Sequence, residues 1–516
     1  MKTQVLIIGG GATGTGLARD LALRGVKCLL VEKQDINAGA SGGNHGLLHS
    51  GARYVSSDGE AAVECREEGE IIKRVAPMCV EETGGMFVAV EGDNEDYVKN
   101  FPGMCEKFGI TYNEIDTKLA RQMEPELSDK IIAAYTVGDA TIDPFVLSLE
   151  NISHARSLGS KILRYQKVSD FKISNGKIVE TILVNTKTGE KTIVEAEQVV
   201  NAAGGWAAEV AAMGGIKIGM MYSKGSLLVT QNRMTKRVIN RLRQASDADI
   251  LVPGGTVSII GTTSITVDSA ENIYPTIQEV DNIIREGSAM VPLLGRTRYI
   301  RAFAGVRPLV SSGEGDGRSV TRGYSLIDHG NEGVNNFTSI TGGKLTTYRL
   351  MAEKTADLVC GKLGVTTPCT TKTEPMPTTH DGQWAEPASA PKNWIKNNNA
   401  DDLLLCECEM VSKNVVDNIV NAIKEQKAVP TIKDVGMRSR VGKGPCQGSF
   451  CGMRIASHMY DKKELSGDEG LEDLKEFVNS RWKGQRSLLA GAQLAQAELQ
   501  EAMQCGLYGL EKRKEE

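Results

Sequence analysis

The sequence predicts an α/β protein that opens with a Rossmann-like dinucleotide-binding unit. An apolar strand at residues 4–8 runs into the turn Gly9-Gly10-Gly11-Ala12-Thr13-Gly14, and a helix from about Thr13 to Leu23 follows. A second apolar strand, residues 28–31, ends at Glu32. A G-x-G-x-x-G turn between a buried strand and a helix, with an acid about 20 residues further on, is the fingerprint of dinucleotide binding.

The glycine turn has a physical role at each fixed position. Gly9 permits the tight turn, Gly11 lets the backbone approach a pyrophosphate, and Gly14 lets the helix pack on the strand. The amides that open the helix, at Ala12 and Thr13, face the phosphates with the positive end of the helix dipole. A glycine turn that binds nothing is the alternative, and the complete set of flanking strands argues against it.

One acid narrows the identity of the dinucleotide. Glu32 stands where a carboxylate grips the ribose hydroxyls, which disfavours NADP and leaves FAD and NAD. Residues 34–54 then combine glycine, serine and histidine, a composition suited to a chain wrapped closely around a ligand. A mobile surface loop is the alternative. The cofactor contacts expected in this part of the chain are Glu32, Lys33, Ser41, Gly46, Leu47 and His49.

Composition sets the class of protein. A chain of 516 residues exceeds one hydrophobic core and predicts several domains. Its 41% hydrophobic and 24% charged residues are typical of a soluble globular enzyme, and the net charge of -5 gives no reason to expect nucleic-acid binding. No apolar stretch has the length of a membrane span and no signal peptide pattern is present, so a cytoplasmic protein with free thiols or metal-bound cysteines is expected.

Helices and strands are expected to alternate between residues 61 and 206. The expected helices cover residues 61–79, 96–108, 116–123 and 145–158, and a strand covers residues 86–90. From Lys161 to Val200 the pattern changes to strands, with hairpin turns at Asn175-Gly176 and at Gly189. A strand that enters a glycine turn near residue 204 allows a second approach to the cofactor. The contacts expected there are Val168, Ala203, Gly204 and Trp206.

A second glycine turn opens another helix. A strand is expected at residues 337–340, followed by Thr341-Gly342-Gly343-Lys344-Leu345-Thr346 and a helix through Leu363. The chain thus offers two helix N-termini, one for a pyrophosphate and one for a polarised ring, which favours FAD over a diffusible nicotinamide. The cofactor contacts expected there are Gly342, Gly343, Leu345 and Thr346.

Several motifs together resemble a known family. They are residues 9–14, Arg53-Tyr54, residues 201–204, residues 304–309 and residues 342–349. They are similar to motifs of the FAD-dependent glycerol-3-phosphate dehydrogenases. The resemblance implies that residues 1–365 form an FAD domain interleaved with a β-sheet substrate domain, as in D-amino-acid oxidase and glycine oxidase. It also implies oxidation of sn-glycerol 3-phosphate to dihydroxyacetone phosphate, by hydride transfer from C2 to flavin N5.

The resemblance further implies a substrate site. Arg307 and Arg322 are the expected phosphate ligands, since the planar fork of arginine suits phosphate oxygens. Arg53, Tyr54 and Lys344 are expected to line the substrate pocket beside the flavin, and Arg53 and Lys344 also count as catalytic. The alternative for any single arginine is a surface ion pair.

The general base is the least defined of these roles. Respiratory, membrane-bound members of the family carry a histidine where this chain has Leu227. His49 is the candidate replacement, because it lies in the loop expected at the flavin. A hydrogen bond to the flavin is its alternative role.

After residue 365 the chain changes character. Residues 366–400 are rich in threonine, proline and asparagine and are expected to form a linker. Residues 401–460 resemble the 2Fe-2S domain of bacterioferritin-associated ferredoxin, which also closes the catalytic subunit of the anaerobic members of the family. Two cysteine pairs flank helices expected at 413–425 and 432–440, and such pairs can converge on a soft metal centre. The expected ligands are Cys406, Cys408, Cys446 and Cys451.

Other interpretations of the C-terminal part stay open. Zinc is the second metal that thiolates select, and buried structural thiols are a third interpretation. An iron-sulfur centre is favoured because the flavin that oxidises the substrate must pass its electrons to an acceptor. Residues 461–516 are expected to be a helical extension built on a helix at 487–505, which docks on its own catalytic domain or on a partner.

The resemblance also implies partners. They are a second flavin-containing subunit, and with it an iron-sulfur membrane-anchor subunit. These chains pass electrons to quinone and hold the protein at the cytoplasmic face of the inner membrane.

Two other functions remain open. One is a flavin oxidase or dehydrogenase for another small anionic substrate, such as a 2-hydroxy acid or an amino acid, and the other is a non-catalytic electron-transfer protein.

Overall fold

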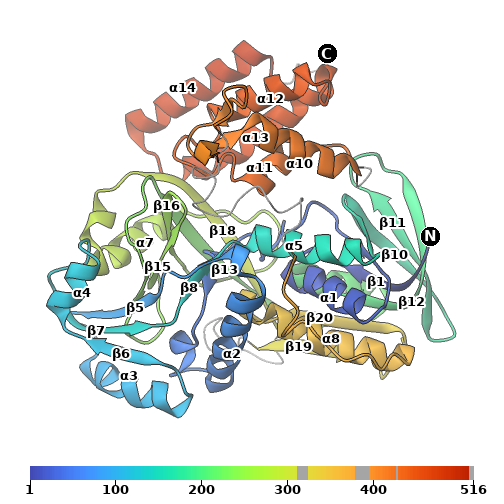
Figure 1. The fold of residues 1–516 in the computed structure, drawn as a ribbon, viewed down its shortest axis with the longest axis horizontal. Helices are drawn as coiled ribbons and strands as arrows, with labels where there is room; N and C mark the ends of the chain where they lie inside the picture. Colours follow the sequence, from blue (N-terminus) through green and yellow to red (C-terminus); the bar gives the residue numbers. More distant parts are fainter. Residues whose placement is uncertain (311–322, 378–393, 397, 426–427, 511–516) are drawn as a thin grey trace.

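Two sheets and a group of C-terminal helices organise the chain. The computed structural model describes residues 1–310, 323–377, 394–396, 398–425 and 428–510. Both sheets are built from the part of the chain before residue 345. In Figure 1 the C-terminal helices lie at the top, over the two sheet-based units.

The first sheet has a parallel core around β1 (Lys2–Ile8). β1 pairs with β12 (Lys191–Asn201) on one side and with β2 (Cys28–Val31) on the other. The parallel core continues from β2 to β9 (Lys161–Leu163) and from β12 to β20 (Phe337–Gly342). The centre of β1 is fully buried, as expected for a parallel strand that is covered on both faces.

Three helices cover one face of this sheet. α1 (Ala12–Leu23) packs between α5 (Pro144–Ser157) and α8 (Tyr348–Leu363). Gly16 permits the close approach of α8, since a Cβ at this position would lie 2.9 Å from the ring of Tyr348. The first helix is therefore fixed on both sides, and its N-terminus has one defined direction.

An antiparallel hairpin extends the first sheet beyond β12. It consists of β10 (Gln166–Ser174) and β11 (Lys177–Asn185). Asn175 and Gly176 both adopt positive φ values, 50° and 68°, which a two-residue hairpin turn of this kind requires. The hairpin predicted at these two residues is confirmed.

The second sheet is built from two separate stretches of the chain. Its strand order is β17-β13-β16-β15-β14-β5-β7-β6, and β18 pairs with β13. The strands are β5 (Gly85–Val90), β6 (Tyr112–Ile115), β7 (Ile131–Val137), β13 (Met220–Thr230), β14 (Val238–Arg241), β15 (Ile250–Gly254), β16 (Val257–Gly261), β17 (Ile265–Val267) and β18 (Tyr299–Val310). Strands of the first sheet precede, separate and follow these two stretches, so the two domains are interleaved as predicted.

The remaining elements of this part surround the two sheets. They are β3 (Leu47–Leu48), α2 (Gly59–Val75), β4 (Val80–Glu81), α3 (Glu95–Lys107), α4 (Thr117–Met123), β8 (Ala140–Ile142), α6 (Ala207–Met213) and α7 (Ile277–Met290). β19 (Tyr324–Asp328) belongs to the first sheet, where it pairs antiparallel with β20. α2 was expected to reach residue 79 and ends at Val75. Pro77 explains the difference, because a proline disfavours helical backbone at the residue before it, and Ala76 has φ of -136°.

The beginning of the predicted linker lies against the first domain. Met376 is buried, and the backbone oxygen of Glu374 accepts a 2.7 Å hydrogen bond from Arg19 of α1. The hydroxyl of Thr371 accepts a hydrogen bond from Arg349 of α8. Residues 378–393 of the predicted linker lie outside the described residues.

The C-terminal unit is helical, with a short two-stranded ribbon. Its elements are β21 (Leu404–Cys406), β22 (Val411–Ser412), α10 (Lys413–Glu425), α11 (Ile432–Ser439), α12 (Cys451–Asp461), α13 (Gly467–Arg486) and α14 (Gly491–Tyr508). The helix expected at residues 487–505 instead starts at Gly491, whose φ of 55° breaks the path from α13. In the part of the chain that the structure describes, no helix combines the length and the apolar character that a membrane crossing requires.

Candidate functional site

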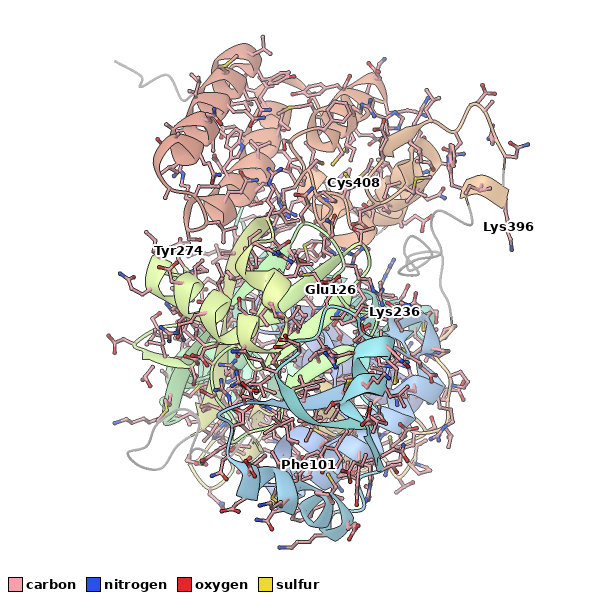
Figure 2. The ribbon with its side chains drawn as sticks, turned by 90° about the vertical axis from the view of Figure 1, so that its left-hand side faces the viewer. Phe101, Glu126, Lys236, Tyr274, Lys396 and Cys408 are labelled. Atoms are coloured by element: carbon pink, nitrogen blue, oxygen red, sulfur yellow. The ribbon has the colours of Figure 1, made fainter. Side chains whose placement is uncertain are left out.

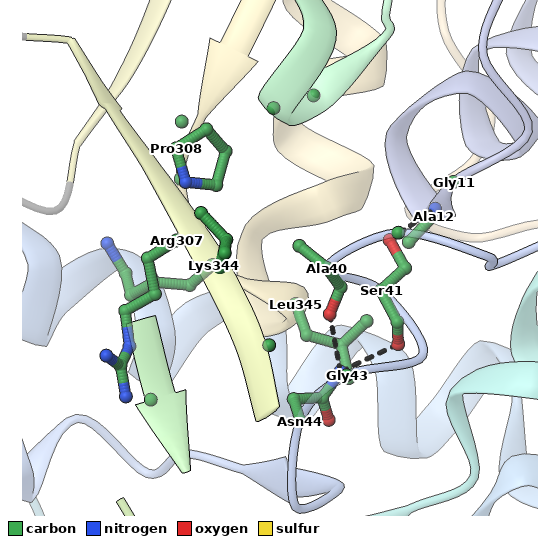
Figure 3. A pocket seen from close by; sticks show the side chains of 18 of the residues that line it. Gly11, Ala12, Ala40, Ser41, Gly43, Asn44, Arg307, Pro308, Lys344 and Leu345 are labelled. Atoms are coloured by element: carbon green, nitrogen blue, oxygen red, sulfur yellow. Dashed lines mark hydrogen bonds between the residues drawn. The ribbon is translucent and has the colours of Figure 1, made fainter. Parts of the chain in front are cut away.

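A cavity of about 870 Å³ is lined by residues of both sheets. Its volume is in the range of sites that hold small molecules and cofactors. The walls come from segments that are remote in sequence, namely the glycine turn after β1, residues 38–49, strand β18 and residues 342–346. Figure 3 shows part of this wall, with Ser41 beside Ala12 on one side of the view and Arg307 with Lys344 on the other.

The glycine turn has the geometry that the sequence predicts. Gly9 has φ of 117°, and a Cβ there would lie 2.4 Å from the backbone oxygen of Ala202. A Cβ at Gly14 would lie 2.0 Å from the backbone oxygen of Gly9, so only glycine allows α1 to start this close to the strand. Gly14 therefore fixes the shape of the turn through its contact with Gly9. It is not among the residues that line the cavity.

The N-terminus of α1 opens into the cavity. Gly11 occupies the N-cap position without a side-chain cap, and the backbone amide of Ala12 donates a 3.0 Å hydrogen bond to Oγ of Ser41 (Figure 3). Thr13 lines the cavity as well. Amides at a helix N-terminus, together with the helix dipole, favour an anionic group such as a pyrophosphate.

Glu32 lies at the end of β2 and is held by two backbone amides. Its carboxylate accepts hydrogen bonds of 2.8 Å from the amide of Gly10 and from the amide of Gln34. Burial raises the pKa of Glu32, while these amides oppose the rise. The carboxylate is thus fixed in the cavity wall, where a ribose can meet it.

The glycine-rich loop is tied together by Asn44. The amide nitrogen of its side chain donates to the backbone oxygen of Ser41 at 2.7 Å and of Ala40 at 3.3 Å (Figure 3). Its side-chain oxygen accepts a 2.8 Å bond from the amide of Gly46. Gly46 has φ of 72° and faces the backbone oxygen of Ile142, so it shapes the loop and does not line the cavity.

Arg307 of β18 brings a cation into the other end of the cavity. Its guanidinium donates to the hydroxyl of Thr262 and, at 3.2 Å, to the backbone oxygen of Thr263. Gly225 of the neighbouring strand makes room for it, since a Cβ there would lie 2.6 Å from Nη2. These two partners are neutral oxygens, and such contacts orient the fork.

Lys344, Tyr54 and His49 form a second polar group in the wall. Nζ of Lys344 lies 5.4 Å from the centre of the Tyr54 ring and 3.8 Å from a carboxylate oxygen of Glu64. The hydroxyl of Tyr54 lies 3.5 Å from Nε2 of His49. All three line the cavity, so a cation and an imidazole are available beside one bound molecule.

Two further predicted positions have definite surroundings. Arg53 lines the cavity and pairs with Asp249, with 2.7 Å between Nη2 and Oδ2. Leu227 also lines the cavity, so an apolar side chain without acid-base capacity occupies the position of the family's histidine. Nearby Lys224 is not a candidate for the general base, because its Nζ pairs with the buried carboxylate of Glu279 at 2.7 Å.

All but three of the predicted cofactor and substrate residues line the cavity. Gly14 and Gly46 are the two described above, and Arg322 lies outside the described residues. The sequence did not predict several other residues of the wall, which are Asn44, Tyr97, Gln244, Ser246 and Pro308. Asn44 lies in the glycine-rich stretch and Pro308 lies in the motif at residues 304–309, so these two could have been included. Tyr97 of α3 and the loop residues Gln244 and Ser246 lie in segments without a motif, so no local signal marked them.

The four C-terminal cysteines converge on one another. Hydrogen bonding with Cys451 lowers the pKa of Cys446 and of Cys406, and the same hydrogen bonds raise the pKa of Cys451. Burial raises the pKa of Cys408 to about 11. Cys406 and Cys451 are buried and the other two are half-buried. Figure 2 shows Cys408 in the C-terminal unit, towards its boundary with the sheets.

The mutual hydrogen bonds place these thiols together without the geometry of a metal site. Across the described ranges, no group of three or more His, Cys, Asp or Glu side chains is arranged to hold a metal ion. What the structure does provide is a thiol with a lowered pKa, and the thiolate is the form that binds soft metals.

The fold and the cavity are those of an FAD-dependent oxidoreductase. Residues 4–358 match the family described as DAO, FAD dependent oxidoreductase. Among solved structures, the glycerol-3-phosphate dehydrogenase from Bacillus halodurans complexed with FAD matches with a TM-score of 0.68 and 22% identity, over 95% of this chain and 96% of that one. Glycine oxidase from Bacillus cereus has the same fold, with a TM-score of 0.56 over 70% of this chain.

The chain has higher sequence identity to one group of proteins within this class. The chain is 42% identical to a subunit of the anaerobic glycerol-3-phosphate dehydrogenase of Escherichia coli (strain K12), over 99% of this chain and 98% of the relative. It is 40% identical to the protein of the same name from Haemophilus influenzae, over 99% and 94%. The chain therefore belongs to this family of anaerobic glycerol-3-phosphate dehydrogenase subunits.

The residues of the cavity fit FAD. The cavity runs from the N-terminus of α1 and Glu32 to the polar group around Arg307 and Lys344, and glycines line it where side chains would block it. A Cβ at Gly11 would meet Oγ of Ser41 at 3.0 Å. Amides for a pyrophosphate, a carboxylate for a ribose and an open wall are the features that this cofactor requires.

Proposed function

We propose that this chain oxidises sn-glycerol 3-phosphate to dihydroxyacetone phosphate with FAD as its cofactor. The observation that carries the proposal is the position of Arg307 and Lys344 in the cavity that also holds the glycine turn. A phosphorylated polyol needs fixed cations, and these two side chains supply them beside the space for a flavin. When FAD is bound, it supplies the acceptor for the hydride of C2.

The other side chains of the wall have supporting roles. Arg307 binds the phosphate through its fork, which Thr262 and Thr263 orient. Lys344 adds a second positive charge and Tyr54 packs beside it. Arg53 shapes the wall through its pair with Asp249. Arg322 remains a predicted second phosphate ligand.

His49 is the proposed base for the C2 hydroxyl. His49→Ala is expected to slow flavin reduction by substrate about 100-fold or more, because a positioned base contributes at least that factor. Stopped-flow absorbance at the oxidised flavin band measures the rate, and FAD content should stay at the wild-type level. Tyr54→Phe removes only the hydroxyl that lies 3.5 Å from the imidazole, so it should slow flavin reduction less than His49→Ala does. A wild-type rate in His49→Ala would show that the base is elsewhere.

An anaerobic titration tests the function itself. Glycerol 3-phosphate added under nitrogen to the FAD-loaded chain is expected to bleach the flavin stoichiometrically. Bleaching only by a 2-hydroxy acid or an amino acid would favour the alternative substrate class. Reduction by no small donor would favour a chain that only relays electrons.

We also propose that Cys406, Cys408, Cys446 and Cys451 hold a 2Fe-2S cluster. Their convergence and the lowered pKa of Cys446 support thiolate ligation, and zinc is the alternative occupant. Analysis of iron, acid-labile sulfide and zinc in anaerobically purified protein distinguishes the two. About two irons and two sulfides per chain are expected for the cluster.

Partner chains complete the proposal. The names of both relatives describe one subunit of an enzyme, which supports an assembly with other chains. We expect a second flavin subunit, and with it an iron-sulfur membrane-anchor subunit. Quinone is the expected final acceptor, and the assembly is expected at the cytoplasmic face of the inner membrane. Co-purification of the chain with membranes only when the other subunits are present would support this arrangement.

A further inference from the structure

A buried carboxylate lies behind the cavity wall at Arg307. Glu279 is the third residue of α7, is 4% exposed and does not itself line the cavity. Its carboxylate accepts hydrogen bonds from four side chains, which are Nζ of Lys224 at 2.7 Å, Oγ of Ser226 at 2.8 Å, Oγ1 of Thr263 at 2.9 Å and Oγ1 of Thr276 at 3.1 Å. We name these five residues the Glu279 network.

The charges of the Glu279 network balance each other. Burial by itself would raise the pKa of Glu279, but hydrogen bonds from Lys224, from the backbone amide of Thr276 and from the two other hydroxyls hold this pKa below its ordinary value. The carboxylate is therefore ionised, and Lys224 is its buried cationic partner. A balanced pair adds little charge to the cavity, so its contribution to the site is geometric.

Helix capping accounts for only part of the Glu279 network. Thr276 is the N-cap of α7, and it forms a capping box with Glu279. Such a box needs only these two residues. The hydrogen bonds from Ser226 and Thr263 are additional, and they join α7 to β13 and to the segment that follows β16.

Thr263 links Glu279 to Arg307. The hydroxyl of Thr263 donates to Glu279, and its backbone oxygen accepts the 3.2 Å hydrogen bond from Nη1 of Arg307. The neighbouring hydroxyl of Thr262 accepts from Nη2 of the same guanidinium. One buried residue thus contacts the carboxylate through its side chain and the arginine through its backbone.

Regular strand pairing does not fix this segment. Pairing with β13 stops at Gly261, opposite Leu227, and resumes at Ile265, opposite Lys224. Residues 262–264 therefore stand opposite only two residues of β13, and this unequal spacing interrupts the ladder. The amide of Ser226, on β13, donates to the hydroxyl of Thr263 at 3.0 Å instead of to a backbone oxygen. Side-chain hydrogen bonds hold the segment where the ladder is interrupted.

We propose that Glu279 is a positioning residue for phosphate binding, which fixes residues 262–264 through Thr263 and so holds the guanidinium of Arg307 in the orientation that the phosphate requires. The inference rests on the proposed function, in which Arg307 is a phosphate ligand. A guanidinium binds phosphate through two parallel hydrogen bonds, so its orientation matters as well as its charge. Fixing that orientation before the ligand arrives lowers the entropy lost on binding.

Thr263→Val tests the link with both charges of the network retained. The affinity of the FAD-loaded protein for inorganic phosphate, measured by isothermal titration calorimetry, should fall about tenfold, the effect of one lost hydrogen bond to a charged group. KM for glycerol 3-phosphate should rise by a similar factor while kcat stays within about twofold. Thr263→Ser keeps the hydroxyl and should behave as wild type.

Glu279→Gln tests the carboxylate itself. It should weaken phosphate binding in the same direction, and the melting temperature should fall because Lys224 loses its buried partner. Lys224→Met combined with Glu279→Gln removes both charges and should recover stability without recovering phosphate affinity. Thr263→Val alone decides the matter if Glu279→Gln does not yield folded protein.

A double-mutant cycle with Arg307→Gln separates positioning from a merely structural role. Thr263→Val should cause no further loss of phosphate affinity in the Arg307→Gln background, because the Glu279 network acts through that guanidinium. Losses that multiply independently would overturn the proposal.

Arg241→Gln is the matched control for a lost buried charge pair. Arg241 makes a buried fork with Asp93 and contacts the backbone oxygen of Glu286 in α7, so the change affects the same sheet and helix without touching residues 262–264. It should leave phosphate affinity and KM within about twofold of wild type.

Two failures can be told apart. Unchanged phosphate affinity in Thr263→Val, or a lowered kcat with unchanged KM, would overturn the positioning role of Glu279. A wild-type flavin that glycerol 3-phosphate does not bleach would overturn the proposed function instead, and the phosphate affinities of the variants would still decide whether the Glu279 network positions Arg307.

Discussion

Arg307→Gln is expected to lower kcat/KM for glycerol 3-phosphate by about 1000-fold, since each charge-assisted hydrogen bond contributes about 1.5–3 kcal/mol and a fork makes two. The residue lies on β18, and neutral oxygens of Thr262 and Thr263 orient its guanidinium. Glutamine keeps a hydrogen-bond donor but is shorter and removes the positive charge. The loss should fall mainly on KM, because the phosphate is bound equally before and during hydride removal.

Anaerobic flavin bleaching as a function of substrate concentration measures this effect. Arg307→Lys should lose less, since it retains a point charge without the fork. Arg233→Gln is the control, because Arg233 makes a partly exposed ion pair with Glu81 and does not line the cavity. FAD content should be normal in all three variants. A near-normal KM in Arg307→Gln would place the phosphate elsewhere in the cavity.

Gly14→Ala is expected to abolish FAD binding and to destabilise the first domain by about 3 kcal/mol or more, the range of severe overpacking. The added methyl group would lie 2.0 Å from the backbone oxygen of Gly9, and no rotamer of alanine can move its Cβ away from that oxygen. Either α1 shifts away from β1 or the turn opens, and both changes move the amides of Ala12 and Thr13 from the pyrophosphate.

The ratio of flavin to protein absorbance after purification, together with the melting temperature, measures both effects. Gly103→Ala in α3 is the matched control. A Cβ at Gly103 would meet nothing within 4 Å, so this change should leave FAD content intact and raise helix stability by about 0.5–1 kcal/mol. Stoichiometric FAD in Gly14→Ala would mean that the turn does not set the cofactor site.

The parts of the fold that depend on neighbouring residues were predictable. The glycine turn and the hairpin at Asn175-Gly176 follow from turn chemistry. The parallel strands that flank the glycine turn follow from short apolar runs. The interleaving of the domains and the positions of Arg307 and Lys344 in the cavity came from the resemblance of motifs, because no periodicity shows which remote segments meet.

The C-terminal unit shows where such prediction ends. The sequence analysis did not single out α13, although Leu471, Leu474, Val478 and Trp482 recur at the three- and four-residue spacing of a helix. Packing stabilises this helix, with Phe477 and Trp482 buried. The ring of Phe477 lies against glycines of the cysteine loop, where a Cβ at Gly448 would lie 2.8 Å from it. A helix of this kind forms because the tertiary structure buries two large side chains.

The sequence by itself determined the dinucleotide turn, the hairpin at Asn175-Gly176 and the two pairs of cysteines, because these depend on residues that are close along the chain. Only the tertiary structure decided which charges meet. Arg53 pairs with Asp249, and Arg438 reaches Asp35 across 403 positions of sequence. The energy of a buried charge depends on the partner that folding brings beside it, and that partner is set by the packing of whole elements rather than by local sequence.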